Sequence, residues 1–159
     1  QNIQINGAPL VVLDGVLGNE EGVQTFLVSD HWLESSIVSV PVASEALVVT
    51  KLDIAKIIDE YQINALALDI EGGECELIDG MSMETLQKFK RILLEYHITQ
   101  LYADEIKGME IWLKEAGFIE TESRTRFTFL SIEDRRPTRQ VRCVYRSYIH
   151  ESLLPEFEG

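Results

Sequence analysis

LALDIEGGECELIDG, residues 66–80, is the stretch from which the fold of this chain can be worked out. Apolar or small residues lead up to Asp69-Ile70-Glu71, and two glycines then open a helix-like segment that carries Glu74. A buried strand that ends in carboxylates at a turn is where α/β proteins usually place their chemistry. We therefore expect these acidic residues to lie at the functional edge of a sheet.

A helix pattern comes directly before this strand. Thr50-Lys51-Leu52-Asp53 matches the capping-box signature of a helix start, and apolar residues continue at helical spacing to Tyr61. The strand itself is expected over residues 64–70. This order of helix and strand is typical of a parallel sheet.

A second short strand ends in ionisable groups in the same way. In RILLEYHIT, residues 91–99, three apolar residues are followed by Glu95-Tyr96-His97. If the two strands lie side by side and parallel, Asp69, Glu71, Glu95 and His97 converge on one edge of the sheet. The two strands together predict a candidate site.

The remainder of the second half alternates between helix and strand patterns. Residues 74–78 predict a short helix, Ser82 is the expected N-cap of another, and residues 104–116 predict the clearest helix, with Gly117 as its C-terminal cap. The runs that follow favour strands that form an antiparallel pair: residues 118–122, 125–132 and 141–149.

The first half is less regular. Residues 11–13 and 23–28 are expected to form consecutive strands in a hairpin-like unit. In residues 29–50 only the stretch from Leu47 to Val49 is strand-like, so this segment favours a loop. Such a loop could cover a pocket, with Trp32 and Ser36 as substrate contacts, or be a surface connection in which Trp32 packs against the sheet.

Composition limits the classes of protein that this chain can represent. It has 159 residues, 45% of them apolar, and 14 basic against 27 acidic residues give a net charge of −13. We expect one soluble, cytoplasmic domain over residues 1–150, followed by an acidic tail over residues 151–159. The negative charge disfavours nucleic acid as a partner, and no apolar run is long enough to cross a membrane.

Neither the cysteines nor the first residues suggest secretion. Cys75 and Cys143 match no metal-ligand or redox spacing, which favours reduced thiols in a cytoplasmic protein. QNIQINGAPL lacks the basic region and apolar core of a signal peptide, and it is typical of the middle of a protein.

At residues 66–80 the sequence resembles the signature of FkbM-type methyltransferases, in which a buried strand runs into D-x-E-G-x-E and a helix ending in glycine. RILLEYH resembles the next strand of that family. Other parts of the family pattern have counterparts along the chain, namely Asn2 to Gly7, Leu17-Gly18 with Glu20 and Glu21, Ser35-Ser36, and Thr50 to Asp53.

The resemblance implies a class I S-adenosylmethionine-dependent methyltransferase that acts on a hydroxyl of a sugar or natural product. Its fold would be Rossmann-like α/β, with a mostly parallel sheet and a C-terminal antiparallel hairpin. The family begins with a strand, a D-x-G-x-x-x-G turn that holds the cofactor, a helix and a second strand. We expect this first strand-helix-strand unit to be lacking here, either because Gln1 is not the natural start or because the chain is a remnant.

The resemblance also suggests roles for individual residues. Asp69 matches the position near methyl transfer and would act in catalysis and in cofactor binding, and Glu71 would act in catalysis. His97 would be catalytic, Glu95 would contact the substrate, and Asp14 would face the adenine of the cofactor.

Two kinds of chemistry are compatible with these groups. His97 is the best general base by its ordinary pKa, whereas Asp69 with Glu71 and Glu74 could bind Mg²⁺ and polarise the substrate hydroxyl. The purely structural alternative is that the acidic residues cap the following helix and favour its dipole.

Two other classes of function stay open. One is a non-catalytic α/β interaction module, and the other is a Mg²⁺-dependent phosphoryl-transfer or hydrolase domain built on Asp69 and Glu71. The expected partner of the preferred function is a small molecule with a hydroxyl group. A homo-oligomer is compatible with this interpretation.

Overall fold

The computed structural model describes residues 10–29, 43–70, 73–98, 103–133 and 136–156 of the chain. These residues form seven strands, which are β1 (Val16–Gly18), β2 (Gly22–Ser29), β3 (Ala43–Asp53), β4 (Ala65–Leu68), β5 (Arg91–Ile98), β6 (Phe118–Glu133) and β7 (Arg136–His150). The helices are α2 (Ile54–Tyr61), α3 (Glu74–Gly80), α4 (Met83–Leu86), α5 (Ala103–Glu115) and the 3-10 helix η1 (Glu151–Glu156).

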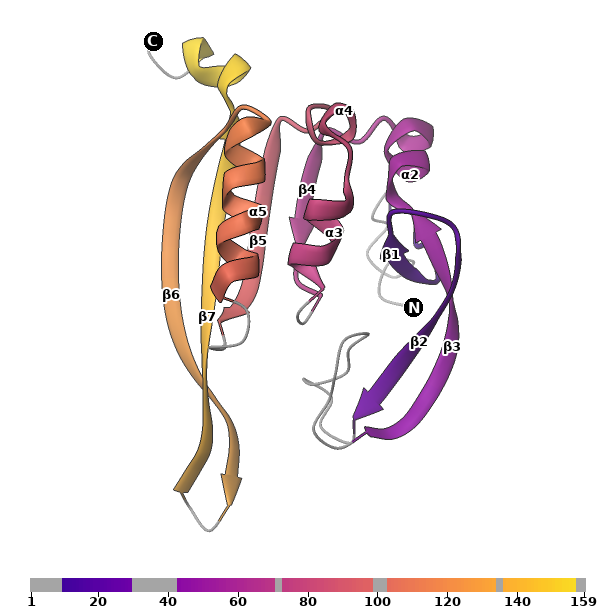
Figure 1. Ribbon diagram of the computed structural model, residues 1–159, viewed down its shortest axis with the longest axis vertical. Helices are drawn as coiled ribbons and strands as arrows, with labels where there is room; N and C mark the ends of the chain where they lie inside the picture. Colours follow the sequence, from indigo (N-terminus) through magenta and orange to yellow (C-terminus); the bar gives the residue numbers. More distant parts are fainter. Residues whose placement is uncertain (1–9, 30–42, 71–72, 99–102, 134–135, 157–159) are drawn as a thin grey trace.

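The strands form two sheets (Figure 1). The smaller has the order β1-β3-β2, with β1 parallel and β2 antiparallel to β3. The larger has the order β4-β5-β7-β6, in which β4 and β5 are parallel and β7 is antiparallel to both of its neighbours. The prediction of parallel neighbours at residues 64–70 and 91–99 is therefore confirmed.

The α/β class and the C-terminal antiparallel hairpin agree with the expectation, but a mostly parallel sheet does not. Both sheets are mixed, and most strand pairs are antiparallel. A parallel pair needs a crossover connection, which α3 and α4 provide between β4 and β5. Because β6 turns back directly into β7, the other pairs of the larger sheet run antiparallel.

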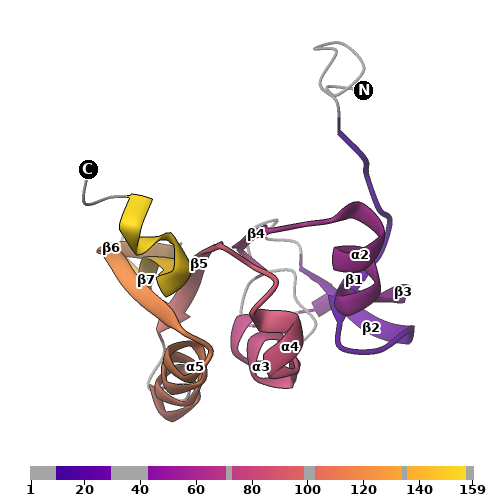
Figure 2. The same cartoon turned by 90° about the horizontal axis from the view of Figure 1, so that it is seen from above.

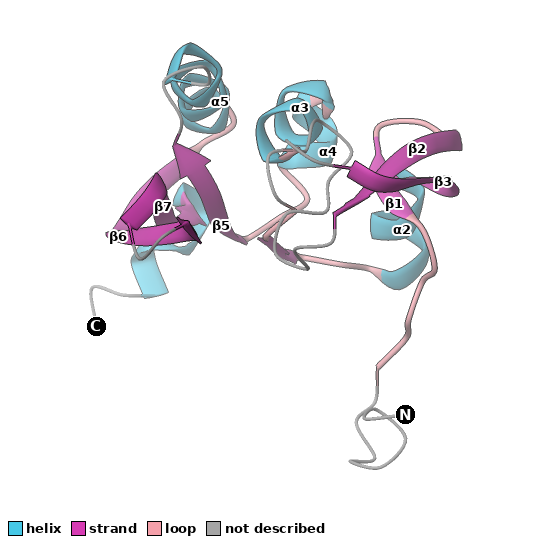
Figure 3. Cartoon of the chain, turned by 90° about the horizontal axis from the view of Figure 1, so that it is seen from below, coloured by secondary structure: helices cyan, strands magenta, loops and turns pink. Residues whose placement is uncertain are grey.

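Helices α3, α4 and α5 lie on the same face of the larger sheet (Figures 2 and 3). Between these helices and the sheet lies an apolar core, which also takes in residues of α2. Its largest fully buried apolar side chains include Phe89, Ile78, Leu86, Ile92, Leu94, Met109 and Leu113. Burial of this apolar surface is the main source of stability for the helix-on-sheet arrangement.

A β-bulge at Thr121 divides the acidic residues of β6 between the two faces of the sheet. Glu120 is opposite Tyr148 and Glu122 is opposite Ser147, so the register shifts by one residue between them. The Thr121 hydroxyl donates a hydrogen bond to the carbonyl of Ser147 at 3.1 Å. A bulge reverses the alternation of side chains, which places Glu120 on the helix side and Glu122 on the opposite side.

The smaller sheet differs from the expected hairpin. Residues 11–13 are not in a strand and are 42–71% exposed, and the strand β1 begins only at Val16. β1 and β2 do not pair with each other, because β3 lies between them. β3 itself extends from Ala43 to Asp53, far beyond the three residues that the sequence indicated, because it pairs with β2 up to Lys51 and with β1 from Lys51 to Asp53.

Helix α2 begins later than the capping box suggested. Its N-cap is Asp53, whose carboxylate accepts a hydrogen bond from the backbone N–H of Ala55 at 2.9 Å. Thr50 is instead paired with Val23 inside the smaller sheet. Strand pairing through Asp53 therefore overrides the local signal at Thr50.

The C-terminal part of the described chain follows the sequence prediction closely. α5 buries Ile106, Met109, Leu113 and the adjoining Ala116. Residues 151–156, expected in the acidic tail, form η1, where Leu153 is buried. None of the helices in the described ranges combines the length and apolar character needed to cross a membrane.

Gly117 ends α5 with a positive φ of 89°, and its backbone N–H bonds to the carbonyl of Lys114 at 3.0 Å. A Cβ at this position would also lie 3.1 Å from the Nε2 of His150. We expect Gly117→Ala to lower the free energy of unfolding by about 1–2 kcal/mol. Urea denaturation followed by circular dichroism measures this change.

Gly108, within α5, offers a control substitution that should change the stability in the opposite direction. A Cβ there would meet no atom within 4 Å, so Gly108→Ala should raise the free energy of unfolding by about 0.5–1 kcal/mol. Equal effects of the two substitutions would contradict the assignment of Gly117 as the helix cap.

Candidate functional site

The candidate site lies at the C-terminal end of β4, where the chain turns into α3. Leu68 is buried as the last residue of the strand, and Asp69 follows it with an exposed side chain. The backbone N–H of Ile70 donates a hydrogen bond to the Oε1 of Glu74 at 2.9 Å. Glu74 is only 1% exposed, so its carboxylate is held inside the turn that it stabilises.

Gly73 is the N-cap of α3 and has no side chain with which to cap the helix. Glu74 and Glu76 stand in the first turn, where negative charge suits the helix dipole. The purely structural role proposed for acidic residues of the motif therefore fits Glu74. Asp69 contrasts with it, because its side chain is exposed.

The parallel pairing of β4 with β5 brings two of the predicted site residues to one level. Leu68 is opposite Leu94, so Asp69 and Glu95 follow at equivalent positions of adjacent strands. Backbone pairing places His97 two residues further along β5, opposite Cys143, while its side chain is outside those that the structure describes. Asp69 and Glu95 thus lie at the same level of adjacent strands, but β5 continues to Ile98 and does not end at Glu95 as the sequence suggested.

Other predicted residues are elsewhere. Asp14 is exposed just before β1. Glu71, Trp32 and Ser36 fall outside the described residues, so their predicted roles stay predictions.

A pocket of about 230 Å³ lies between the smaller sheet and the 66–80 motif. We call it the motif pocket. Residues of the β1–β2 region, of β3 and of the motif contribute its walls, and they are Leu17, Gly18, Asn19, Glu20, Gln24, Lys51, Ile70, Gly73, Glu76 and Leu77. Half of these are polar or charged side chains, which provide both hydrogen-bond donors and acceptors.

Charge is distributed asymmetrically around the motif pocket. Lys51 Nζ lies 2.8 Å from Glu20 Oε1, and this hydrogen bond lowers the pKa of the Glu20 carboxyl. Glu76 adds a second carboxylate to the lining. With one lysine and two glutamates, the pocket carries more negative than positive charge.

Cys75 follows Glu74 in α3 but is a poor nucleophile. Burial, together with the carboxylates of Asp79 and Glu74, raises the pKa of its thiol to about 12. Since the thiolate is the reactive form, Cys75 stays protonated and unreactive at neutral pH. This agrees with the inert thiol that the sequence indicated.

The predicted Mg²⁺ ligands do not make up a metal site among the described residues. In that part of the chain, no three His, Cys, Asp or Glu side chains are grouped closely enough to hold a metal ion. One oxygen of Glu74 is already engaged by the Ile70 N–H. Glu71, the third predicted ligand, lies outside the described residues.

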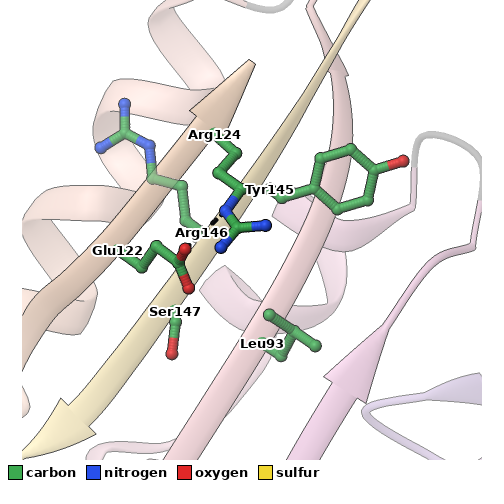
Figure 4. Close-up of a pocket in the computed structure, with 6 residues that line it drawn as sticks. All are labelled: Leu93, Glu122, Arg124, Tyr145, Arg146 and Ser147. Atoms are coloured by element: carbon green, nitrogen blue, oxygen red, sulfur yellow. Dashed lines mark hydrogen bonds and ion pairs between the residues drawn. The ribbon is translucent and has the colours of Figure 1, made fainter. Parts of the chain in front are cut away.

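A second pocket, of about 280 Å³, lies on the larger sheet (Figure 4). Its lining comes from three neighbouring strands: Leu93 of β5, Glu122 and Arg124 of β6, and Tyr145, Arg146 and Ser147 of β7. Arg124 Nε is 2.5 Å from Glu122 Oε1, so these two charges neutralise each other. Among the described residues, none of the predicted site residues lines this pocket, whereas the motif pocket is lined by Ile70, the residue after Asp69.

Sequence reasoning missed Asn19, Gln24 and Lys51 as residues of the candidate site. The only signal was the polar turn Gly18-Asn19-Glu20-Glu21-Gly22, which indicated a connection between strands. Its position beside α3 depends on contacts with residues more than fifty positions away, and local patterns carry no information about them.

Comparison with known proteins gives one match. The family model described as "Methyltransferase FkbM domain" matches residues 11–120, which is more than half of the chain. No curated protein and no solved structure gives a significant match. The matched residues include the whole of the smaller sheet, part of the larger sheet, the motif pocket and the whole of the 66–80 motif.

Proposed function

The chain belongs to the FkbM methyltransferase family, and from this premise we propose that it transfers a methyl group from S-adenosylmethionine to a hydroxyl group of a small molecule such as a sugar or natural product. The observation that carries the proposal is that Asp69 follows the carboxyl end of β4, level with Glu95 of the parallel strand β5, and that the next residue, Ile70, lines the motif pocket. Ligands of open α/β sheets bind at this edge.

The residues present fit part of such a cofactor. S-adenosylmethionine would supply an electrophilic methyl group on a sulfonium ion, and the carboxylate of Asp69 is exposed where it could stabilise that positive charge. The two glutamates in the lining of the motif pocket also favour a positive charge nearby. The Gly-rich turn expected to hold the methionine end has no counterpart in residues 1–159.

The acceptor hydroxyl needs orientation and the removal of its proton. We propose that Glu95 binds the acceptor and that His97 takes the proton, because its ordinary pKa of about 6.5 suits a general base near neutral pH. Asp69 orients the reacting groups from the neighbouring strand. Since the described residues do not group into a metal site, we propose no step through Mg²⁺.

A small-molecule acceptor also agrees with the charge of the chain. A net charge of −13 repels polyanions such as nucleic acids, whereas a neutral polyhydroxylated compound meets no such repulsion. The polar side chains of the motif pocket offer hydrogen bonds to hydroxyl groups.

Titration calorimetry of the full natural protein with S-adenosylhomocysteine tests the proposed cofactor. We expect saturable binding to one site per chain, because the product analogue shares all but the transferred methyl group. Adenosine monophosphate is the control ligand and should bind far more weakly, since its phosphate would meet the acidic residues of the site. Absence of any binding of S-adenosylhomocysteine would favour the non-catalytic interaction module.

A further inference from the structure

One side chain connects the smaller sheet directly to the 66–80 motif. Asn19, in the turn between β1 and β2, donates hydrogen bonds from Nδ2 to the carbonyl of Leu77 at 3.2 Å and to the carbonyl of Glu76 at 3.4 Å. Both acceptors are backbone atoms of α3. Carbonyl groups near the C-terminus of a short helix often lack intrahelical partners, so Asn19 supplies a cap from a distant turn.

Gly80, the last residue of α3, explains how Asn19 can come so close. A Cβ built on Gly80 would lie 2.0 Å from Nδ2 and 2.8 Å from Cγ of Asn19. Among the described glycines only Gly117 has a positive φ, so the backbone at position 80 does not itself require glycine. A side chain at position 80 would therefore displace the Asn19 side chain from its present place.

The other contacts of the same turn are weaker. Glu20 pairs with Lys51 and Glu21 pairs with Lys56, each at 2.8 Å, but both glutamates are largely exposed. Exposed ion pairs of this kind contribute little to stability. Asn19, by contrast, makes a partly buried contact to the motif, and so it determines where the turn sits relative to α3.

The motif pocket lies between the two parts that Asn19 joins. Gly18, Asn19 and Glu20 line it on one side, and Ile70, Gly73 and Glu76 line it on the other. Its width therefore depends on the distance between the β1–β2 turn and α3. The described residues of the lining include no aromatic ring on which a nucleobase could stack, while their carboxylate, amide and ammonium groups suit hydroxyl groups.

We propose that Asn19 is a positioning residue that holds the β1–β2 turn as one wall of the motif pocket, and that this pocket binds the hydroxyl-bearing acceptor. The proposal rests on the proposed function and adds the place where the acceptor binds. Asn19 acts through the turn that it holds. Gly80 is the partner position that allows this contact.

The first test is a double-mutant cycle on stability, which needs no enzymatic activity. Asn19→Ala removes the two hydrogen bonds, and Gly80→Ala displaces the same side chain, so each should lower the urea midpoint of unfolding. In the Asn19→Ala background the new methyl group has room, so adding Gly80→Ala should cost much less than it does alone. Additive effects would overturn the contact between the two positions.

The second test separates the acceptor from the cofactor. In the full natural protein, Asn19→Ala and the isosteric Asn19→Asp, which cannot donate to the carbonyls, should raise the KM for the acceptor roughly tenfold, equivalent to about 1.4 kcal/mol. The Kd for S-adenosylhomocysteine should stay within about twofold of the wild-type value. Glu21→Ala is the matched control, because Glu21 lies in the same turn but does not line the pocket.

The outcomes distinguish this proposal from the proposed function. An unchanged acceptor KM in an active Asn19→Ala variant, or a changed Kd for S-adenosylhomocysteine alone, would overturn the acceptor pocket. A wild-type protein without methyl transfer would overturn the proposed function and the acceptor assignment with it. In that case the stability cycle still decides whether Asn19 and Gly80 fix the turn against α3.

Discussion

Replacing Asp69 with alanine is expected to lower the rate of methyl transfer by about 100- to 1,000-fold, the usual effect of removing one preorganised electrostatic contact at a reacting centre. Asp69 follows the last residue of β4, and its exposed side chain lies level with Glu95 of the parallel strand β5. Transfer of a labelled methyl group from S-adenosylmethionine measures the loss.

Stability separates a catalytic from a structural role for Asp69. Because its side chain is exposed, Asp69→Ala should change the free energy of unfolding by less than about 0.5 kcal/mol. Glu115→Ala is a suitable control for both assays, since Glu115 is an exposed carboxylate at the end of α5, away from the motif. If Asp69→Ala kept wild-type activity, Asp69 would have no part in the site.

Replacing Glu74 should act mainly on stability. Glu74→Ala is expected to lower the free energy of unfolding by about 2–3 kcal/mol, because the partly buried N–H of Ile70 loses its acceptor and the motif loses packing. For a chain of this length the melting temperature would fall by about 4–10 °C. Differential scanning calorimetry measures both quantities.

Glu74→Gln is the matched variant, because its amide oxygen can still accept the bond from Ile70. It should recover more than half of the stability that Glu74→Ala loses. Equal losses in the two variants would mean that the carboxylate charge, rather than the hydrogen bond at 2.9 Å, is what the turn needs.

The parts of the fold that the sequence could predict depend on local patterns. The buried face of α5 follows from helical spacing, and the cap at Gly117 follows from glycine's access to positive φ. The parallel pair β4 and β5 follows from two short apolar runs separated by a helical segment. In each case the residues that determine the structure are close together in the chain.

The parts that could not be predicted depend on distant contacts. β3 is long because it pairs with β2, although its sequence is polar and mixed, and the same pairing moves the cap of α2 from Thr50 to Asp53. The bulge at Thr121 reverses the side-chain alternation of β6 through a bond to Ser147. Periodicity in one segment cannot reveal which segment will pair with it.

The contacts of the candidate site also fall into a local group and a distant group. The hydrogen bond from Ile70 to Glu74 joins residues four positions apart and belongs to the motif itself. The contact from Asn19 to Leu77 joins residues 58 positions apart, so the wall of the motif pocket emerged only with the structure. The sequence thus located the acidic edge but not the pocket beside it.

We propose that this chain is a methyltransferase and that its 66–80 motif forms the edge where the methyl group is transferred. The most direct measurement is an assay of the full natural protein with S-adenosylmethionine labelled in its methyl group and a panel of sugars and natural-product alcohols. We expect at least one acceptor to receive the labelled methyl group as a methyl ether. The Asp69→Ala variant should transfer far less of it. Equal transfer by the Asp69→Ala variant would contradict the role of the motif. A wild-type protein that methylates no acceptor and does not bind S-adenosylhomocysteine would contradict the proposed activity.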